Sequence, residues 1–282
     1  MSARSPEAKP ALTPVRWVRV LGHDIRISVR PGTEPGPPLL LCNGIGAGLD
    51  VLQPFVDAVD PRIEVVRFDV PGVGGSPTPT VPYTFPTLAC FVSRLMQQLG
   101  YEDFDVLGFS WGGALAQQVA FQNPRHCRRL VLVSTGTGML MVPGRYSVLS
   151  KMLTPRRYRD PEYARAVAGE LYGGRIRERP GDVRHLLSYQ SRIGSRTGYL
   201  FQLLAGVGWT SLPALPLIRQ PTLVLAGRDD PIVPNINGHL MARLLPHAKL
   251  HIFDDGHLGL LTAASELGPL ISAFLRDRRI ES

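Results

Sequence analysis

The chain has 282 residues, of which 44% are hydrophobic and 19% charged, and its formal net charge is +8. This composition is typical of a globular protein with a full core, and no apolar run approaches the roughly 20 residues that cross a bilayer. Three cysteines without metal-ligand spacing indicate free thiols in a reducing compartment. We therefore expect a cytoplasmic protein with no transmembrane segment and no metal.

Most of the positive charge lies in residues 145–196, which contain twelve Arg or Lys and five Asp or Glu. A basic segment can bind nucleic acid, but this one lacks interleaved aromatic residues and any recognisable nucleic-acid module. We expect no nucleic-acid partner. The segment is interpreted as a solvated positive face, and contact with another anionic surface is the alternative.

The N-terminal residues 1–14 are rich in Pro, Ser and Ala and contain no apolar stretch. This pattern predicts a disordered tail and not a secretory signal. Residues 15–20 and 24–29 are rich in β-formers and predict a hairpin that turns at Gly22 and His23.

Residues 39–42 form a continuous apolar run, which predicts a strand covered on both faces, with Cys42 as a core residue. The Gly-rich loop 43–48 follows. A phosphate-binding loop would need Gly-Lys-Ser/Thr there, and a dinucleotide fingerprint would need glycine where Leu49 stands. Both patterns fail, so no cofactor is expected. The backbone N–H of Ile45 is instead a candidate donor to an oxyanion.

Residues 108–112 have the sequence G-x-S-x-G, between an apolar strand and a run that favours helix. A turn sharp enough to expose the Ser110 hydroxyl leaves no room for a Cβ two positions before or after it. The pattern therefore predicts a nucleophile elbow with Ser110 as nucleophile. The N–H of the next residue, Trp111, is the second candidate oxyanion donor.

Strands at 63–68 and 129–133 alternate with a helix at 85–99, which predicts a parallel sheet with right-handed crossovers. The alternation stops at 136–215, where periodic helical stretches replace strands. We expect this segment to be a helical lid subdomain inserted into a core formed by residues 15–135 and 216–282.

The sheet is predicted to resume at 221–226 and to end at 249–253, each time with acidic residues at the carboxyl end of the strand. Asp230 is favoured over Asp229 because the following proline fixes its turn, and Asp229 is interpreted as an exposed turn residue. His257 stands just beyond the last strand, before a closing helix at 258–275. Serine, acid and base would thus share one rim of the sheet, because parallel strands point the same way.

The order Ser110, Asp230, His257 is that of the α/β-hydrolase fold. The chain resembles this family, and more narrowly the intracellular medium-chain-length poly(3-hydroxyalkanoate) depolymerases, over residues 39–275. The more specific matching segments are 43–47, 68–76, 110–118, 141–144, 172–174, 208–211 and 219–227. The resemblance implies a mostly parallel sheet of about eight strands with helices on both faces and a helical lid.

The resemblance also implies a serine hydrolase that cleaves polyester or oligomer esters through an acyl-enzyme. A carboxylesterase, lactonase or thioesterase for small acyl substrates is an alternative, as is a cofactor-free haloperoxidase-like enzyme or a non-catalytic binding protein. Apolar lid residues either bind alkyl side chains or form the core of the lid. Association of the basic lid face with a polymer granule is a further hypothesis, and the oligomeric state is left open.

Overall fold

The computed structural model describes residues 14–190 and 192–277, so almost all of the predicted tail at 1–14 lies outside the described residues. One sheet runs through the molecule in the strand order β1-β2-β4-β3-β5-β6-β7-β8. The strands are β1 Val15–Val20, β2 His23–Arg30, β3 Leu39–Cys42, β4 Val65–Phe68, β5 Phe104–Phe109, β6 Cys127–Val133, β7 Thr222–Gly227 and β8 Ala248–Phe253. Only β1–β2 and β2–β4 pair antiparallel among these strands, which confirms the predicted, mostly parallel sheet.

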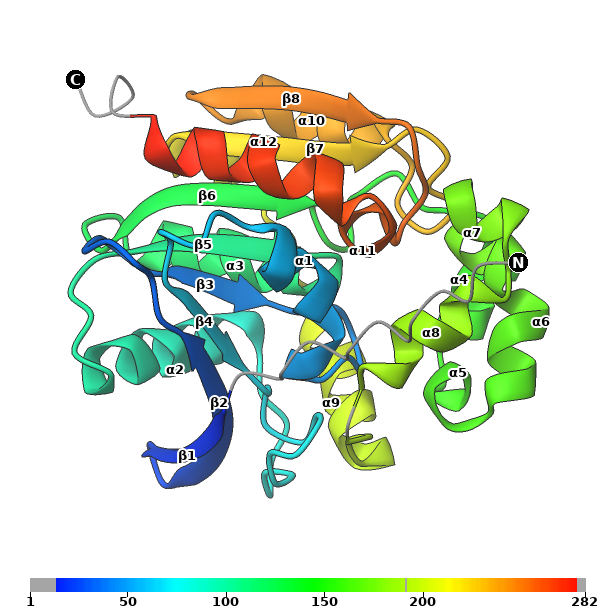
Figure 1. The fold of residues 1–282 in the computed structure, drawn as a ribbon, viewed down its shortest axis with the longest axis horizontal. Coiled ribbons are helices and arrows are strands. Elements are labelled where there is room, and N and C mark those ends of the chain that lie inside the picture. Colours follow the sequence, from blue (N-terminus) through cyan, green and yellow to red (C-terminus); the bar gives the residue numbers. More distant parts are fainter. Residues whose placement is uncertain (1–13, 191, 278–282) are drawn as a thin grey trace, which may run out of the picture.

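Helices cover both faces of this sheet (Figure 1). Those of the core are α1 Gln53–Ala58, α2 Phe85–Gln98, α3 Trp111–Gln122, α10 Ile236–Leu244, α11 Gly259–Thr262 and α12 Ala264–Arg276, with 3₁₀ turns at Leu49–Leu52 and Leu215–Leu217. Alternate residues of each strand pack into two hydrophobic cores, one on each face of the sheet. In β3, Leu39 and Leu41 pack with α1 and α12, whereas Leu40 and Cys42 pack with α2 and α3. This explains why β3 is apolar at every position.

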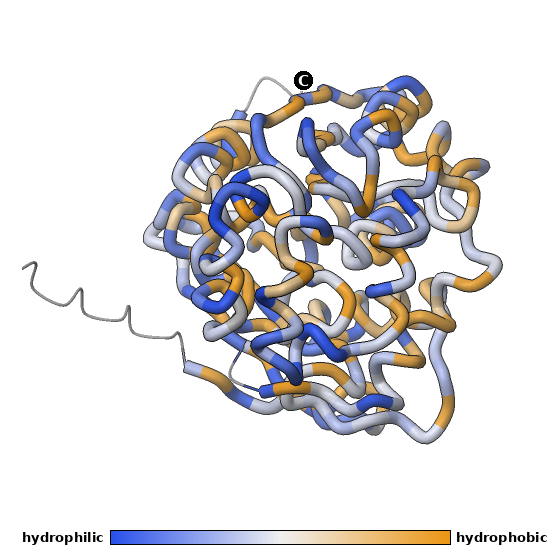
Figure 2. The backbone as a smooth tube through the Cα atoms, turned by 90° about the vertical axis from the view of Figure 1, so that its right-hand side faces the viewer, coloured by the Kyte–Doolittle hydropathy of each residue, from blue (hydrophilic) through white to orange (hydrophobic). Residues whose placement is uncertain are grey.

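The predicted insertion is helical throughout its regular structure. It contains α4 Tyr146–Leu149, a 3₁₀ turn at Ser150–Met152, α5 Arg156–Arg159, α6 Pro161–Tyr172, α7 Gly174–Glu178, α8 Asp182–Ser188 and α9 Arg196–Gly206. A bridge between Gly138 and Thr210 joins its two ends. The helices stand beyond the carboxyl ends of the parallel strands (Figure 1), and hydrophilic and hydrophobic residues alternate along the chain on that side (Figure 2).

Several predicted strands differ from the structure by one or two residues at an end; the strand predicted at 63–68, for example, begins at Val65. Two other predictions were wrong in kind. The first hairpin turns at Leu21 and Gly22, and His23 already belongs to β2, where it pairs with Val20. Leu21 and Gly22 have positive φ angles of 47° and 85°, as in the two-residue hairpin turn that follows the right-handed twist of the strands. The closing helix is broken at Ala263, which leaves the helical conformation between α11 and α12.

Candidate active site

Ser110 occupies a sharp turn between β5 and α3, as predicted. Its backbone has φ 54° and ψ −121°, a conformation that is strained for a residue with a side chain. A Cβ on Gly108 would lie 2.4 Å from the carbonyl oxygen of Gly112, and one on Gly112 would lie 2.1 Å from that of Cys42. Glycine at both positions is therefore what allows β5, α3 and β3 to approach closely at the turn.

Hydrogen bonds on both sides of the Ser110 residue hold this strained backbone. Its N–H donates to the carbonyl of Val133 at 2.9 Å. Its carbonyl accepts from the hydroxyl of Thr135 and from the N–H of Gly113, both at 2.8 Å. The surrounding strand ends thus fix where the Ser110 hydroxyl points.

The Ser110 hydroxyl meets the imidazole of His257, and the imidazole meets the carboxylate of Asp230. Oγ of Ser110 lies 2.9 Å from Nε2 of His257, and Nδ1 of His257 lies 2.8 Å from Oδ2 of Asp230. The other oxygen of Asp230 accepts from the N–H groups of Ile232 and Val233, each at 2.9 Å. Because an ionised carboxylate only accepts, Nδ1 carries the proton and the lone pair of Nε2 faces the hydroxyl.

The lid and the core together hold the imidazole. The backbone N–H of His257 donates to the carbonyl of Tyr172, at the end of α6, at 2.7 Å. The ring of Phe109 lies 5.4 Å from the imidazole between centroids. His257 and Asp230 are 3% and 6% exposed, so their contact is shielded from water and salt.

Asp229 and Asp255 attach the insertion to the loops that carry Asp230 and His257. Asp229 accepts from the N–H of Gly174 and pairs with Arg177 at 2.8 Å. Asp255 accepts from the N–H of Arg175. The interpretation of Asp229 as an exposed turn residue was incomplete, because its side chain is exposed and also bound to α7.

The loop 43–48, which carries the candidate oxyanion donor Ile45, is held by hydrogen bonds from its first residue. Asn43 accepts from the N–H of Gly44 and donates to the carbonyl of Gly48, at 2.8 and 2.7 Å. Asp69 accepts from the N–H of Leu49 at 2.6 Å. Burial raises the pKa of Asp69, while this bond and its other donors oppose the rise.

The N–H groups of Ile45 and Trp111 have no acceptor in the part of the chain that the structure describes, so both are free to donate. Gln202 of α9 contacts both the loop of Ile45 and the side chain of Trp111. Its side chain accepts from the N–H of Gly46, and its carbonyl accepts from the indole N–H of Trp111, at 2.7 and 2.8 Å. Nothing in the sequence marked Gln202 as a site residue.

A cavity of about 30 Å³ lies beside Ser110. Its walls include Ile45, Phe109, Arg157, Tyr158 and His257. It has room for a water molecule or two, far below the roughly 300–1,000 Å³ typical of ligand pockets. A substrate with an alkyl chain is larger than this cavity.

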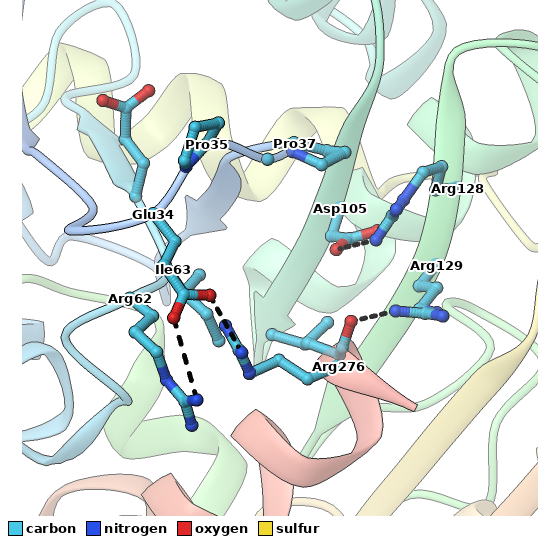
Figure 3. Close-up of a pocket in the computed structure, with 12 residues that line it drawn as sticks. Glu34, Pro35, Pro37, Arg62, Ile63, Asp105, Arg128, Arg129 and Arg276 are labelled. Atoms are coloured by element: carbon cyan, nitrogen blue, oxygen red, sulfur yellow. Dashed lines mark hydrogen bonds and ion pairs between the residues drawn. The ribbon is translucent and has the colours of Figure 1, made fainter. Parts of the chain in front are cut away.

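A larger cavity, of about 180 Å³, is shown in Figure 3. It lies near the amino ends of β5 and β6, where Asp105 and Arg128 line it, and Ser110 is not among its lining residues. Its arginines are already bound. Arg62 and Arg276 contact Glu34, and Arg128 pairs with Asp105 at 3.1 Å. This cavity offers charges that are already compensated and no nucleophile.

Cys42 is fully buried, as predicted, and burial raises the pKa of its thiol. A buried thiol with a raised pKa is a poor nucleophile. Within residues 14–190 and 192–277, no cluster of three His, Cys, Asp or Glu side chains is arranged to hold a metal ion. No helix in those ranges is long and apolar enough to span a bilayer.

Comparison with known proteins places this geometry in a family. Residues 37–264 match the family model of the alpha/beta hydrolase fold, and the chain belongs to that family. The chain is 49% identical to the poly(3-hydroxyalkanoate) depolymerase of Ectopseudomonas oleovorans, over 94% of this chain and 93% of the relative. The predicted family resemblance is thereby confirmed.

More distant relatives differ in what their names describe. The 3-oxoadipate enol-lactonase 2 of Acinetobacter baylyi is 25% identical, over 80% of this chain and 84% of the relative. Among solved structures, the enol-lactonase from Burkholderia xenovorans superposes with a TM-score of 0.80 at 23% identity, covering 93% of this chain and all of that one. At this identity the likeness shows the fold alone.

Proposed function

We propose that this chain is a serine esterase that cleaves the ester bonds of poly(3-hydroxyalkanoate) or its oligomers through an acyl-enzyme. The observation that carries the proposal is the hydrogen-bonded series from Asp230 through His257 to Ser110. The substrate class is supported by the 49% identity to a poly(3-hydroxyalkanoate) depolymerase over nearly the whole of both chains.

The reaction begins when Oγ of Ser110 attacks the ester carbonyl and passes its proton to Nε2 of His257. Asp230 holds the imidazole in the required tautomer and stabilises its charged form. The N–H groups of Ile45 and Trp111 donate to the oxyanion, each contributing on the order of a hundredfold to turnover.

The ester C–O bond then breaks, and the His257 proton moves to the departing 3-hydroxyl oxygen. A water molecule replaces the leaving group, gives a proton to Nε2 and attacks the acyl-enzyme. The second tetrahedral intermediate collapses, Ser110 leaves and takes the proton back, and the hydroxyacid is released. Protons and bonds balance without a cofactor.

Residues 136–215 act in this proposal as a lid that opens for the acyl chain. Its support is the small cavity beside Ser110 and the contacts that lid residues Tyr172, Arg157 and Gln202 make with the site. The same small cavity favours a second candidate, hydrolysis of small soluble esters or lactones without a large lid movement.

Turnover on a dispersed medium-chain polyester, compared with short p-nitrophenyl esters, separates the two candidates. A polyester hydrolase should release hydroxyacids from the dispersion, and Ser110→Ala should release none. Activity on short esters with none on polymer or oligomers would favour the second candidate.

Granule association is proposed from a groove of about 540 Å³ on the lid. Leu153 and Leu200, which are 63% and 50% exposed, line it together with Arg156, Arg159 and Arg196. Exposed leucines beside arginines suit an apolar surface that carries negative charge. Co-sedimentation with polymer granules should fall at high salt and with leucine-to-serine changes in the groove, and unchanged binding would contradict the proposal.

A further inference from the structure

Arg157 of α5 is a buried cation whose partners are neutral. The residue is only 2% exposed to solvent. One terminal nitrogen donates to the hydroxyl of Tyr199 at 2.9 Å, and the other donates to the carbonyl of Ile45 at 3.2 Å. Within the described residues it forms no ion pair with a carboxylate, and its Nε has no acceptor.

An isolated buried charge destabilises a fold unless a counter-charge compensates it. The chain supplies such partners elsewhere. Arg26, which is 6% exposed, pairs with Asp50 at 2.8 Å and with Asp69 at 3.1 Å. The guanidinium of Arg157 lies against the rings of Tyr158 and Tyr199, at 4.5 and 5.6 Å, but no carboxylate of the described residues pairs with it, so an anionic ligand could supply the counter-charge.

Arg157 also stands at a junction between two cavities. It lines the small cavity beside Ser110 and a second cavity of about 270 Å³ inside the insertion. Arg184, Ser188 and Gln190 line the second cavity, and none of its described lining residues is acidic. Pro161, Ala164 and Ile193 supply apolar wall.

We propose that Arg157 binds the carboxylate at the free-acid end of a 3-hydroxyacyl oligomer, with the 270 Å³ cavity holding that end unit. The inference rests on the proposed function. In the terminal unit of such an oligomer the carboxylate lies close to the ester oxygen that departs from Ser110. The enzyme would then prefer oligomers with a free acid end and release the end unit, and the free hydroxyacid would compete with substrate.

Binding tests this without turnover. In the Ser110→Ala protein, titration calorimetry would compare the dimer of 3-hydroxyoctanoate as free acid with its methyl ester. We expect the acid to bind at least tenfold more tightly. Equal affinity of acid and ester, or a tighter ester, would overturn the inference whatever the variants do.

Variants assign the preference to Arg157. Arg157→Gln should bring the acid to the affinity of the ester, and Arg157→Lys should retain part of the preference. Arg165→Gln, an exposed change on the neighbouring α6, should leave both affinities unchanged. Preference for the acid that survives in folded Arg157→Gln would overturn the assignment.

Turnover separates this inference from the proposed function. With Ser110 present, Arg157→Gln should raise KM for the acid dimer about tenfold or more and change the methyl ester much less. An equal loss of kcat on both dimers means that Arg157 only positions Ile45, which refutes the inference and leaves the esterase intact. If the enzyme with Ser110 hydrolyses neither dimer but the acid still binds more tightly than the ester, the proposed esterase activity is refuted and the carboxylate-binding site at Arg157 is retained.

Discussion

Ser110 and His257 are 147 positions apart in the chain, yet Oγ of the first lies 2.9 Å from Nε2 of the second. The strained turn after β5 fixes the hydroxyl, and the loop after β8 fixes the imidazole. Neither side chain needs to move to transfer a proton. The site is therefore organised before a substrate arrives.

Ser110→Ala should lower ester turnover by at least about 10⁴-fold, because among residues 14–190 and 192–277 no other hydroxyl donates to Nε2 of His257. Labelling by a fluorophosphonate probe should disappear in the same variant. Circular dichroism checks that the fold is retained. Labelling that persists in a folded Ser110→Ala protein would show that the nucleophile lies elsewhere.

Asp230→Asn should cost on the order of 10³- to 10⁴-fold in kcat with little change in fold. The N–H groups of Ile232 and Val233 both donate to Oδ1 of residue 230, so the variant must keep its amide oxygen there. Its amide nitrogen would then face His257. Nδ1 would then have to accept, and the proton would sit on Nε2 facing Ser110. Asp229→Asn is the matched control and should keep kcat within a few fold. Similar losses in both variants would contradict this assignment.

Gln202→Leu should lower kcat by about 10- to 100-fold while changing KM less, because it removes the side-chain acceptor of the Gly46 N–H and frees the loop of Ile45. The indole of Trp111 keeps its bond to the backbone carbonyl of residue 202. Gln118→Leu provides a control, since Gln118 also accepts from a tryptophan, Trp209, at 2.7 Å. Steady-state kinetics on a short p-nitrophenyl ester measures both. If the two variants behave alike, Gln202 has no special connection to the oxyanion donors.

The sequence allowed the strand ends and the triad to be predicted because their signals are local. β3 has the predicted bounds 39–42, since its continuous apolar run lies between Pro38 and the Gly-rich loop that begins at Asn43. Gln202 and Arg157 could not be found this way. They stand in helices without a motif, and their importance arises only when the insertion folds back onto the loop at Ile45.

Gly112→Ala should destabilise the protein by about 3 kcal/mol, because the new Cβ would meet the backbone oxygens of Cys42 and Asn43 at 2.1 and 2.5 Å. Backbone cannot rotate away as a side chain can. Gly36→Ala is the control, since a Cβ there meets nothing within 4 Å, and it should stay within about 0.5 kcal/mol of wild type. Denaturant titration measures both, and equal midpoints would contradict the crowding at Gly112.

Asp60 should make the stability of the fold depend on acid pH. The side chain of Arg62 donates to both oxygens of Asp60 and lowers its pKa to about 2. The unfolded carboxyl titrates near 3.9, so the stability due to ionised Asp60 is complete above that value and is lost as the pH falls toward 2. Asp60→Asn should therefore be less stable than wild type at pH 7, with a gap that narrows between about pH 4 and pH 2. Asp254→Asn, at an 82% exposed side chain, should show a smaller gap. Denaturant titrations at each pH measure the gap, and one that stays constant from pH 7 to pH 2 would show that Asp60 is not ionised preferentially in the fold.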